Sequence, residues 1–183
     1  AARKFDVKTA GVAEVLRTQL SDLVLSPGAY FRSLAYALSL GGWDLRRIAL
    51  CCFYFVEAVL LAAWMRKRHL RHLHVHFATP AATVGIILTK LAPITMSMTV
   101  HGPDEFYDVE GYYLAQKINA CQFVCAIGQF ARSQLMKISP VGDWDKLLIS
   151  PLGVDTDQFV PRTQSRTGHA FEVLCVGRLV AAK

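Results

Sequence analysis

HLHVHFATPAATVGIILTKLAPITMSMTVHG, residues 72–102, decides the fold class of this chain. It contains two short apolar runs, Leu73 to His76 and Pro93 to Val100, which are typical of buried strands. Between them, Thr79 and Pro80 form a helix-start signal, with a capping hydroxyl followed by a first-turn proline. The apolar residues that follow have helical spacing, at Val84, Ile87, Leu88 and Leu91. A strand, a helix and a second strand in this order predict a βαβ unit of a parallel sheet.

The same alternation continues downstream of this unit. Further helices and strands are expected at Tyr112 to Asn119, Phe123 to Ile127, Ala131 to Ile138 and Leu147 to Ile149. The apolar runs are too continuous for strands that are buried on one face only. The sequence therefore predicts an α/β fold, a Rossmann-like parallel sheet with helices on both faces, in which Val75, Met98 and Val124 are buried.

The region upstream, residues 1–69, is expected to be helical. Ser26 and Pro27 start one helix, and Asp44 can cap a longer one. The eighteen residues from Ile48 to Met65 are long enough to span a bilayer, and Glu57 is the one residue among them that is not apolar. A central carboxylate and basic residues at both ends disfavour a membrane span, so we expect a buried or interfacial helix that packs against the sheet domain. In that arrangement Glu57 lies at a surface or in a polar contact.

The composition predicts a globular protein with an unusually apolar surface. Of the 183 residues, 53% are hydrophobic and 19% are charged, and the mean hydropathy is +0.31. Such a surface favours a membrane, an interdomain contact or a partner. The net charge of +6 favours an anionic partner, either nucleotide phosphates or acidic lipid headgroups. Nucleic acid is not expected, because no nucleic-acid-binding motif accompanies the basic residues.

The cysteines indicate the redox compartment in which the chain acts. Five cysteines without a CxxC pair are typical of small buried residues in a reducing cytosol.

The polar segment Pro161 to His169 resembles a linker, and Phe171 to Val176 resembles a new buried strand. We therefore expect a helical region (1–69), a Rossmann-like domain (70–162), a linker (163–170) and the start of a second domain (171–183). The absence of an initiator Met and an end within a motif favour a fragment.

Three places depart from what packing requires, and the first is His101 with Gly102 and Asp104. Ligands of open α/β sheets bind at the carboxyl ends of strands, where His101 could hydrogen-bond a ligand hydroxyl or a phosphate. A strand-end histidine whose ring is hydrogen-bonded by local backbone is the equally supported alternative.

The second place, Gly153 to Asp155 with Phe159, is typical of a structural turn. In the third, Arg178 and Lys183 could bind a diphosphate, although solvated cations after a strand are common.

His72, His74 and His76 alternate, so all three lie on one face of a strand. Some metal sites use this pattern, but no fourth ligand of the right kind is near, and packing or hydrogen-bonding roles are more common. We therefore expect no metal. A hydrolase triad of Ser133, His101 and Asp104 is rejected because the GxSxG nucleophile elbow is missing.

Taken in order, these motifs resemble those of family 4 glycosyltransferases, especially enzymes of exopolysaccharide and colanic-acid-type pathways. The resemblance covers residues 70–183 and rests on five weak motifs in register: His74 to Ala78, Thr99 to Asp104, Ala126-Ile127, Gly153 to Pro161, and Val176 to Leu179 with Lys183. Residues 1–69 match only as a helical region.

The resemblance implies a GT-B fold and a retaining transfer from a nucleotide diphosphate sugar to a lipid-linked or polysaccharide acceptor. It implies no metal or other cofactor, and an enzyme in the cytoplasm, peripheral to the anionic inner face of the membrane. His101 would contact the transferring sugar. The donor diphosphate would bind at Gly177, Arg178 and Lys183, and the cleft would include His76, Gly102, Asp104 and Gly153.

The chain also departs from the family pattern. Gly128 stands where the family commonly has Ser, and the Gly-rich first loop and the paired glutamates of the carboxyl-terminal domain are missing. The fragment is therefore expected to be inactive alone. A non-catalytic, membrane-peripheral binding module of the same fold is the alternative, and paired glutamates in a longer sequence would favour the enzyme.

Overall fold

The computed structural model describes residues 11–159 and Leu174. The expected linker and the donor-side residues Gly177, Arg178 and Lys183 lie outside this part of the chain. The chain divides into two compact units, Ala1–Leu152 and Gly153–Lys183. The helical region and the sheet belong to the first unit, which is described below. In the second unit, η4 (Thr156–Gln158) is a short 3₁₀ helix capped by the Asp155 carboxylate, which accepts from Asp157 N at 3.1 Å.

The first unit contains a parallel sheet of β1 (His72–His76), β2 (Thr95–Val100), β3 (Val124–Ala126) and β4 (Leu147–Ile149), in that order. This confirms the predicted α/β class and the strand order. The register aligns Val75, Met98 and Val124 across the sheet. All three are buried, as predicted, with exposed fractions of 8%, 0% and 0%.

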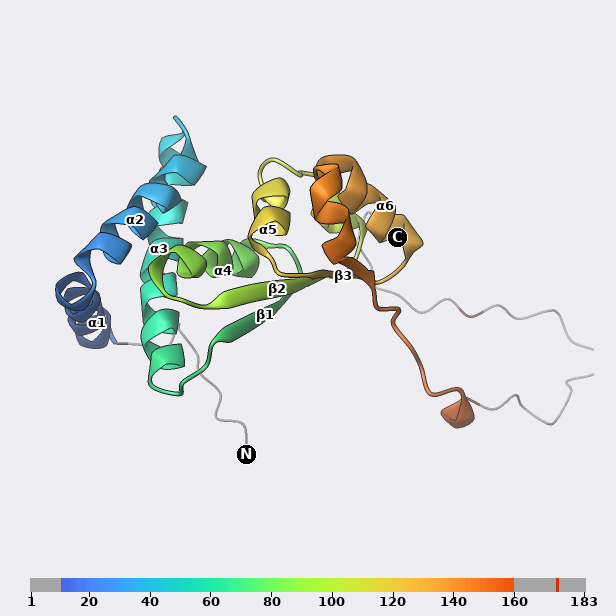
Figure 1. The fold of residues 1–183 in the computed structure, drawn as a ribbon, viewed down its shortest axis with the longest axis horizontal. Coiled ribbons are helices and arrows are strands. Elements are labelled where there is room, and N and C mark those ends of the chain that lie inside the picture. Colours follow the sequence, from blue (N-terminus) through green and yellow to red (C-terminus); the bar gives the residue numbers. More distant parts are fainter. Residues whose placement is uncertain (1–10, 160–173, 175–183) are drawn as a thin grey trace, which may run out of the picture. The chain divides into compact units, whose positions relative to one another are not determined.

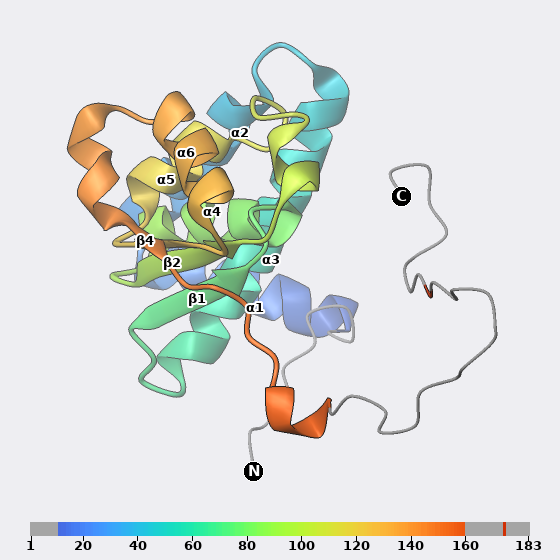
Figure 2. The ribbon, with the colours of Figure 1, turned by 90° about the vertical axis from the view of Figure 1, so that its right-hand side faces the viewer.

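Helices α4 (Pro80–Leu91), α5 (Leu114–Ala120) and α6 (Gln129–Ile138) pack on one face of this sheet (Figure 1, Figure 2). Ile86, Ile118 and Leu135 carry the contact from the helix side, and all three are fully buried. Helices were expected on both faces. Within the described residues no helix of the first unit packs on the second face, which carries imidazoles, hydroxyl groups and the ring of Phe123, stacked on His72 and His74.

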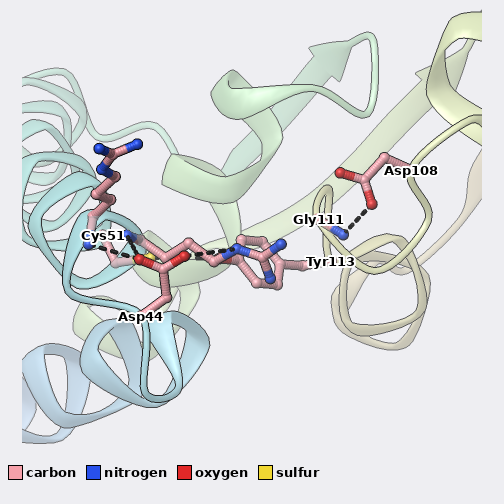
Figure 3. A network of polar contacts seen from close by, with 7 residues as sticks. Asp44, Cys51, Asp108, Gly111 and Tyr113 are labelled. Carbon is pink, nitrogen blue, oxygen red and sulfur yellow. Dashed lines mark hydrogen bonds and ion pairs between the residues drawn. The ribbon is translucent and has the colours of Figure 1, made fainter.

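A second helical layer consists of α1 (Val12–Leu25), α2 (Pro27–Gly41) and α3 (Leu45–Arg66). Helix α3 begins as predicted, because the Asp44 carboxylate accepts from Arg46 N at 2.8 Å and Arg47 N at 3.3 Å (Figure 3). Helix α2 begins at Pro27 as predicted, but the Ser26 side chain makes no capping hydrogen bond.

Helix α3 is the one described helix that is long and apolar enough to cross a membrane, with 22 residues and a mean hydropathy of 2.1 in its most apolar window, 39% of which is buried. Its buried face, which includes Phe55, Val59 and Ala62, packs with Ile87 and Leu88 of α4 in one hydrophobic cluster. The helix thus packs against the sheet domain through α4, and Glu57 is half-buried and makes a polar or electrostatic contact.

Two short 3₁₀ helices of the first unit, η2 (Pro103–Phe106) and η3 (Val141–Lys146), have no counterpart in the sequence prediction. After η2, Tyr113 adopts a left-handed conformation with φ of 54°, and its hydroxyl lies 3.8 Å from Cys51 Sγ of α3 (Figure 3). Burial raises the pKa of Tyr113 to about 12. This contact fixes the start of α5 against the helical layer.

Candidate functional site at the carboxyl ends of β1 and β2

Two histidines meet where β1 and β2 end. His76 Nδ1 lies 3.2 Å from His101 Nε2, a hydrogen bond in which one ring donates and the other accepts. His76 is exposed and His101 is half-buried, so both rings can reach a ligand at this edge. Because β1 and β2 are parallel, residues 25 positions apart in the chain present their imidazoles at one point.

Phe77 packs against His101 of this pair. Its ring centroid lies 4.3 Å from that of His101, and 48% of the residue is exposed. The Phe77 backbone has φ of 70°, and its N–H donates to Thr99 O at 2.9 Å. A bulky residue in the left-handed region costs on the order of 1–3 kcal/mol and is often found at functional sites. The site therefore offers an apolar ring beside two imidazoles.

Glu105 fixes the backbone beneath the histidines. Its side chain is buried, and its carboxylate accepts from Ala78 N, from His101 N at 2.6 Å and from Gly102 N at 3.0 Å. Charge-assisted bonds of this kind are stronger than neutral ones. Gly102 has φ of 157°, which favours glycine, so this turn needs both residues.

Lys117 of α5 holds the same loop from the other side. Its side chain is fully buried, and its Nζ donates to Ala78 O at 2.8 Å and to Thr79 O at 2.9 Å. Burial lowers the pKa of Lys117 to about 7, against the opposing effect of the negative charge of Glu105. The two buried side chains therefore bind the amide and the carbonyl of one residue, Ala78, and determine the path of the chain after β1.

The predicted site residues are only partly brought together. His76, His101 and Gly102 share one edge of the sheet, and the exposed Asp104 lies in η2 beside Glu105. Gly153 belongs to the second unit.

The other two alternating histidines bind hydroxyl groups of β2. His72 contacts Thr95 Oγ1 at 2.7 Å and Ser97 Oγ at 2.8 Å, and His74 contacts Ser97 Oγ at 2.7 Å and Thr99 Oγ1 at 2.9 Å. All four ring nitrogens thus have hydroxyl partners, which supports the hydrogen-bonding interpretation of the alternation. Burial, with His76 and His72 as further causes, lowers the pKa of His74.

Glu105 and Lys117 were not predicted from the sequence. A signal for Lys117 was present, because it lies in the apolar stripe of α5 with Leu114 and Ile118, at a position where a solvated lysine is not expected. Glu105 gave a weaker signal, as an acid three residues after the Gly102 turn.

The arrangement suits a polyhydroxylated ligand, since imidazole nitrogens both donate and accept hydrogen bonds and aromatic rings pack on apolar ligand faces. Comparison of the chain with protein-family models, with curated proteins and with solved structures gives no match.

Proposed function

We propose that this chain is the acceptor-side part of a retaining glycosyltransferase of the GT-B, family 4 type. The observation that supports this best is the His76–His101 pair at the carboxyl ends of adjacent parallel strands, on a backbone held by Glu105. A crevice at this edge is where open α/β sheets bind their ligands. The reaction class, sugar transfer with retention of configuration, is proposed from the order of the sequence motifs, which resembles that of family 4 glycosyltransferases.

In this proposal His101 hydrogen-bonds a hydroxyl of the transferring sugar, and His76 sets the orientation of the His101 ring. The donor is a nucleotide diphosphate sugar, and the acceptor is a lipid-linked or polysaccharide precursor at the cytoplasmic face of a membrane. Arg178 and Lys183 neutralise the leaving diphosphate, where negative charge grows in the transition state. No metal or other cofactor takes part.

The test is sugar transfer by a polypeptide that contains this chain together with a donor-binding half. His101→Ala should lower kcat about a hundredfold, the usual effect of removing one preorganised polar contact to a reacting group. The thermal unfolding temperature should change little, since the ring is half-buried and its backbone contacts remain.

His72→Ala is the matched control, because this histidine lies on the same strand face at the opposite end of β1. It should keep near-normal turnover. If His101→Ala turns over normally and melts earlier, then His101 is a structural residue and the proposal fails. Saccharide binding without any transfer would instead support the non-catalytic module.

A further inference from the structure

A continuous row of hydrogen bonds joins β1 to β2 on the sheet face that, within the described residues, no helix of the first unit covers. His72 Nδ1 lies 2.7 Å from Thr95 Oγ1, and His72 Nε2 lies 2.8 Å from Ser97 Oγ. His74 continues the row, with its Nδ1 2.7 Å from Ser97 Oγ and its Nε2 2.9 Å from Thr99 Oγ1. Two imidazoles and three hydroxyl groups therefore form one imidazole–hydroxyl row, in which the Ser97 hydroxyl bonds to both rings.

The direction in which the protons point is set at the Thr95 end of this row. The Thr95 hydroxyl has an acceptor outside the row, Arg71 O at 3.3 Å, so its oxygen is left to accept from His72 Nδ1. A hydroxyl and a neutral imidazole each have one proton to donate, so the same direction continues along the row. In the opposite direction the Thr99 hydroxyl, on a residue that is 8% exposed, would have no acceptor among the described residues.

The row is complete only while both rings are neutral and carry their proton on Nδ1. The Nε2 atom of His72 then accepts from the Ser97 hydroxyl, and the Nε2 atom of His74 accepts from that of Thr99. A second proton on either ring occupies Nε2, so the facing hydroxyl loses its acceptor. Ser97 is fully buried and Thr99 nearly so, and a hydroxyl without an acceptor is unfavourable at such positions.

The surroundings of the row add to this effect. All four ring nitrogens face hydroxyl groups, so no carboxylate bound to a ring compensates its protonation. Burial, with His76 and His72 as further causes, lowers the pKa of His74 from its ordinary value of 6.5. The titratable or charged side chains that share this sheet face or adjoin the row are Arg71, His76, His101 and Cys125. Apart from the thiol, these groups are cationic or become so in acid, and they oppose a further positive charge.

We infer that the imidazole–hydroxyl row is an acid-sensitive switch, which holds the edge strand β1 on β2 while His72 and His74 are neutral and releases it when they are protonated. Strand β1 lies at the end of the strand order, so it can open while β2, β3 and β4 stay paired. Opening would separate His76 from His101 and so dismantle the candidate site. The inference does not rest on the proposed enzymatic function, since it concerns the attachment of β1 alone.

Nitrogen NMR of the imidazoles at about pH 8, where histidine is ordinarily neutral, tests the direction of the protons. Both His72 and His74 should carry their proton on Nδ1. A proton on Nε2 of either ring would overturn the inference, because the row would then lack the acceptors that acid removes.

Hydrogen exchange tests the release of β1. The amides of Thr95 and Phe77 each donate across the β1–β2 pair at 2.9 Å, and the Ser150 amide donates to β3 at 2.8 Å. In the opened strand His74 regains its ordinary pKa, so the opened form binds more protons below pH 6.5 and acid favours opening.

Between about pH 8 and about pH 5, protection at Thr95 and Phe77 should fall roughly tenfold or more after correction for the intrinsic exchange rate, as expected when one buried hydroxyl loses its acceptor. Protection at Ser150 should stay the same. Unchanged protection at Thr95 and Phe77 would contradict the switch. An equal loss at Ser150 would also contradict it, since the whole unit would then be unfolding.

The double variant His72→Gln/His74→Gln cannot titrate at the row, so its protection at Thr95 and Phe77 should depend much less on pH. Each protein is compared with itself at two pH values, so a lower overall stability of the variant does not affect the result. His69→Asn is the matched control, because His69 is exposed, precedes β1 and has φ of 57°, which asparagine tolerates. It should keep the acid response of the wild type. A full acid response in the double variant, or its loss in His69→Asn, would overturn the inference.

Discussion

Glu105 shows how much one buried residue decides at this site. Its carboxylate binds the amides of Ala78, His101 and Gly102, so it joins the loops that follow β1 and β2. The first of these loops starts directly after His76, and the second begins with His101. The position of His101 is therefore determined as much by Glu105, which a ligand need not touch, as by the strand that precedes it.

We expect Glu105→Gln to destabilise the protein and to move His101. The amide has one acceptor oxygen in place of two, so at least one buried N–H loses its partner, which costs about 1–3 kcal/mol. Chemical denaturation measures the loss, and NMR of the imidazole reports the displacement of the ring.

Glu110→Gln is the control, because Glu110 is exposed and close in the sequence. It should leave the free energy of unfolding within about 0.5 kcal/mol of the wild type. If the two variants behave alike, Glu105 does not hold the site.

At the scale of the element, the start of α6, which follows β3, lacks a side-chain cap. Gly128 is its N-cap residue, with an extended backbone and no side chain to accept the first amides of the helix. A Cβ atom at this position would meet nothing within 4 Å. The serine that the resembled family commonly has here would therefore fit.

We expect Gly128→Ser to raise the free energy of unfolding by about a few tenths of a kcal/mol, since serine caps better than glycine. Thermal unfolding measures this gain. Gly142→Ser is the control, because its Cβ atom is equally unhindered but lies inside η3. A loss of stability in Gly128→Ser would mean that the loop before α6 is packed more tightly than the structure indicates.

At the scale of the whole molecule, the first unit buries its apolar side chains on one side of the sheet. The opposite face is a row of imidazoles over hydroxyl groups, and Ser97 is fully buried beneath His72 and His74. Two ionisable side chains, those of Lys117 and Glu105, are buried behind the site. The lowered pKa of Lys117 couples the stability of the unit to pH.

We expect the free energy of unfolding to rise as the pH increases from about 7 toward 10.5. The pKa of Lys117 in the folded protein is lowered to about 7, whereas its ordinary value is 10.5. Between these two pH values the unfolded chain therefore binds more protons than the folded protein. Raising the pH through this window makes folding more favourable. The change attributable to Lys117 is on the order of a few kcal/mol at most.

Urea denaturation of the wild type and of Lys117→Met at several pH values isolates this effect. The difference between the two proteins should grow with pH across the window, because Met cannot titrate. The exposed Lys137→Met serves as the control and should show no such trend. A parallel pH dependence in the wild type and Lys117→Met would show that Lys117 remains charged in the folded protein.

The sequence by itself determined the elements and their order. Strand β4 matches its predicted bounds, β1, β2 and β3 begin or end within a few residues of theirs, and Asp44 caps α3 as expected. These features depend on hydrophobic periodicity and on capping, which act over a few neighbouring residues. The motif at His101 was found for the same reason, since a buried strand that ends in polar residues is a local pattern.

Only the tertiary structure decided which surfaces are covered and which side chains meet. His76 and His101 are 25 residues apart, Lys117 contacts a carbonyl 39 residues away, and Asp22 meets Arg66 across 44 residues. No periodicity in the sequence encodes such pairs, because they form only when parallel strands and packed helices bring distant segments together. The sheet face without a helix has a related origin: the alternation in β1 and β2 specifies which side chains share a face, and the packing of the other elements decides what covers that face.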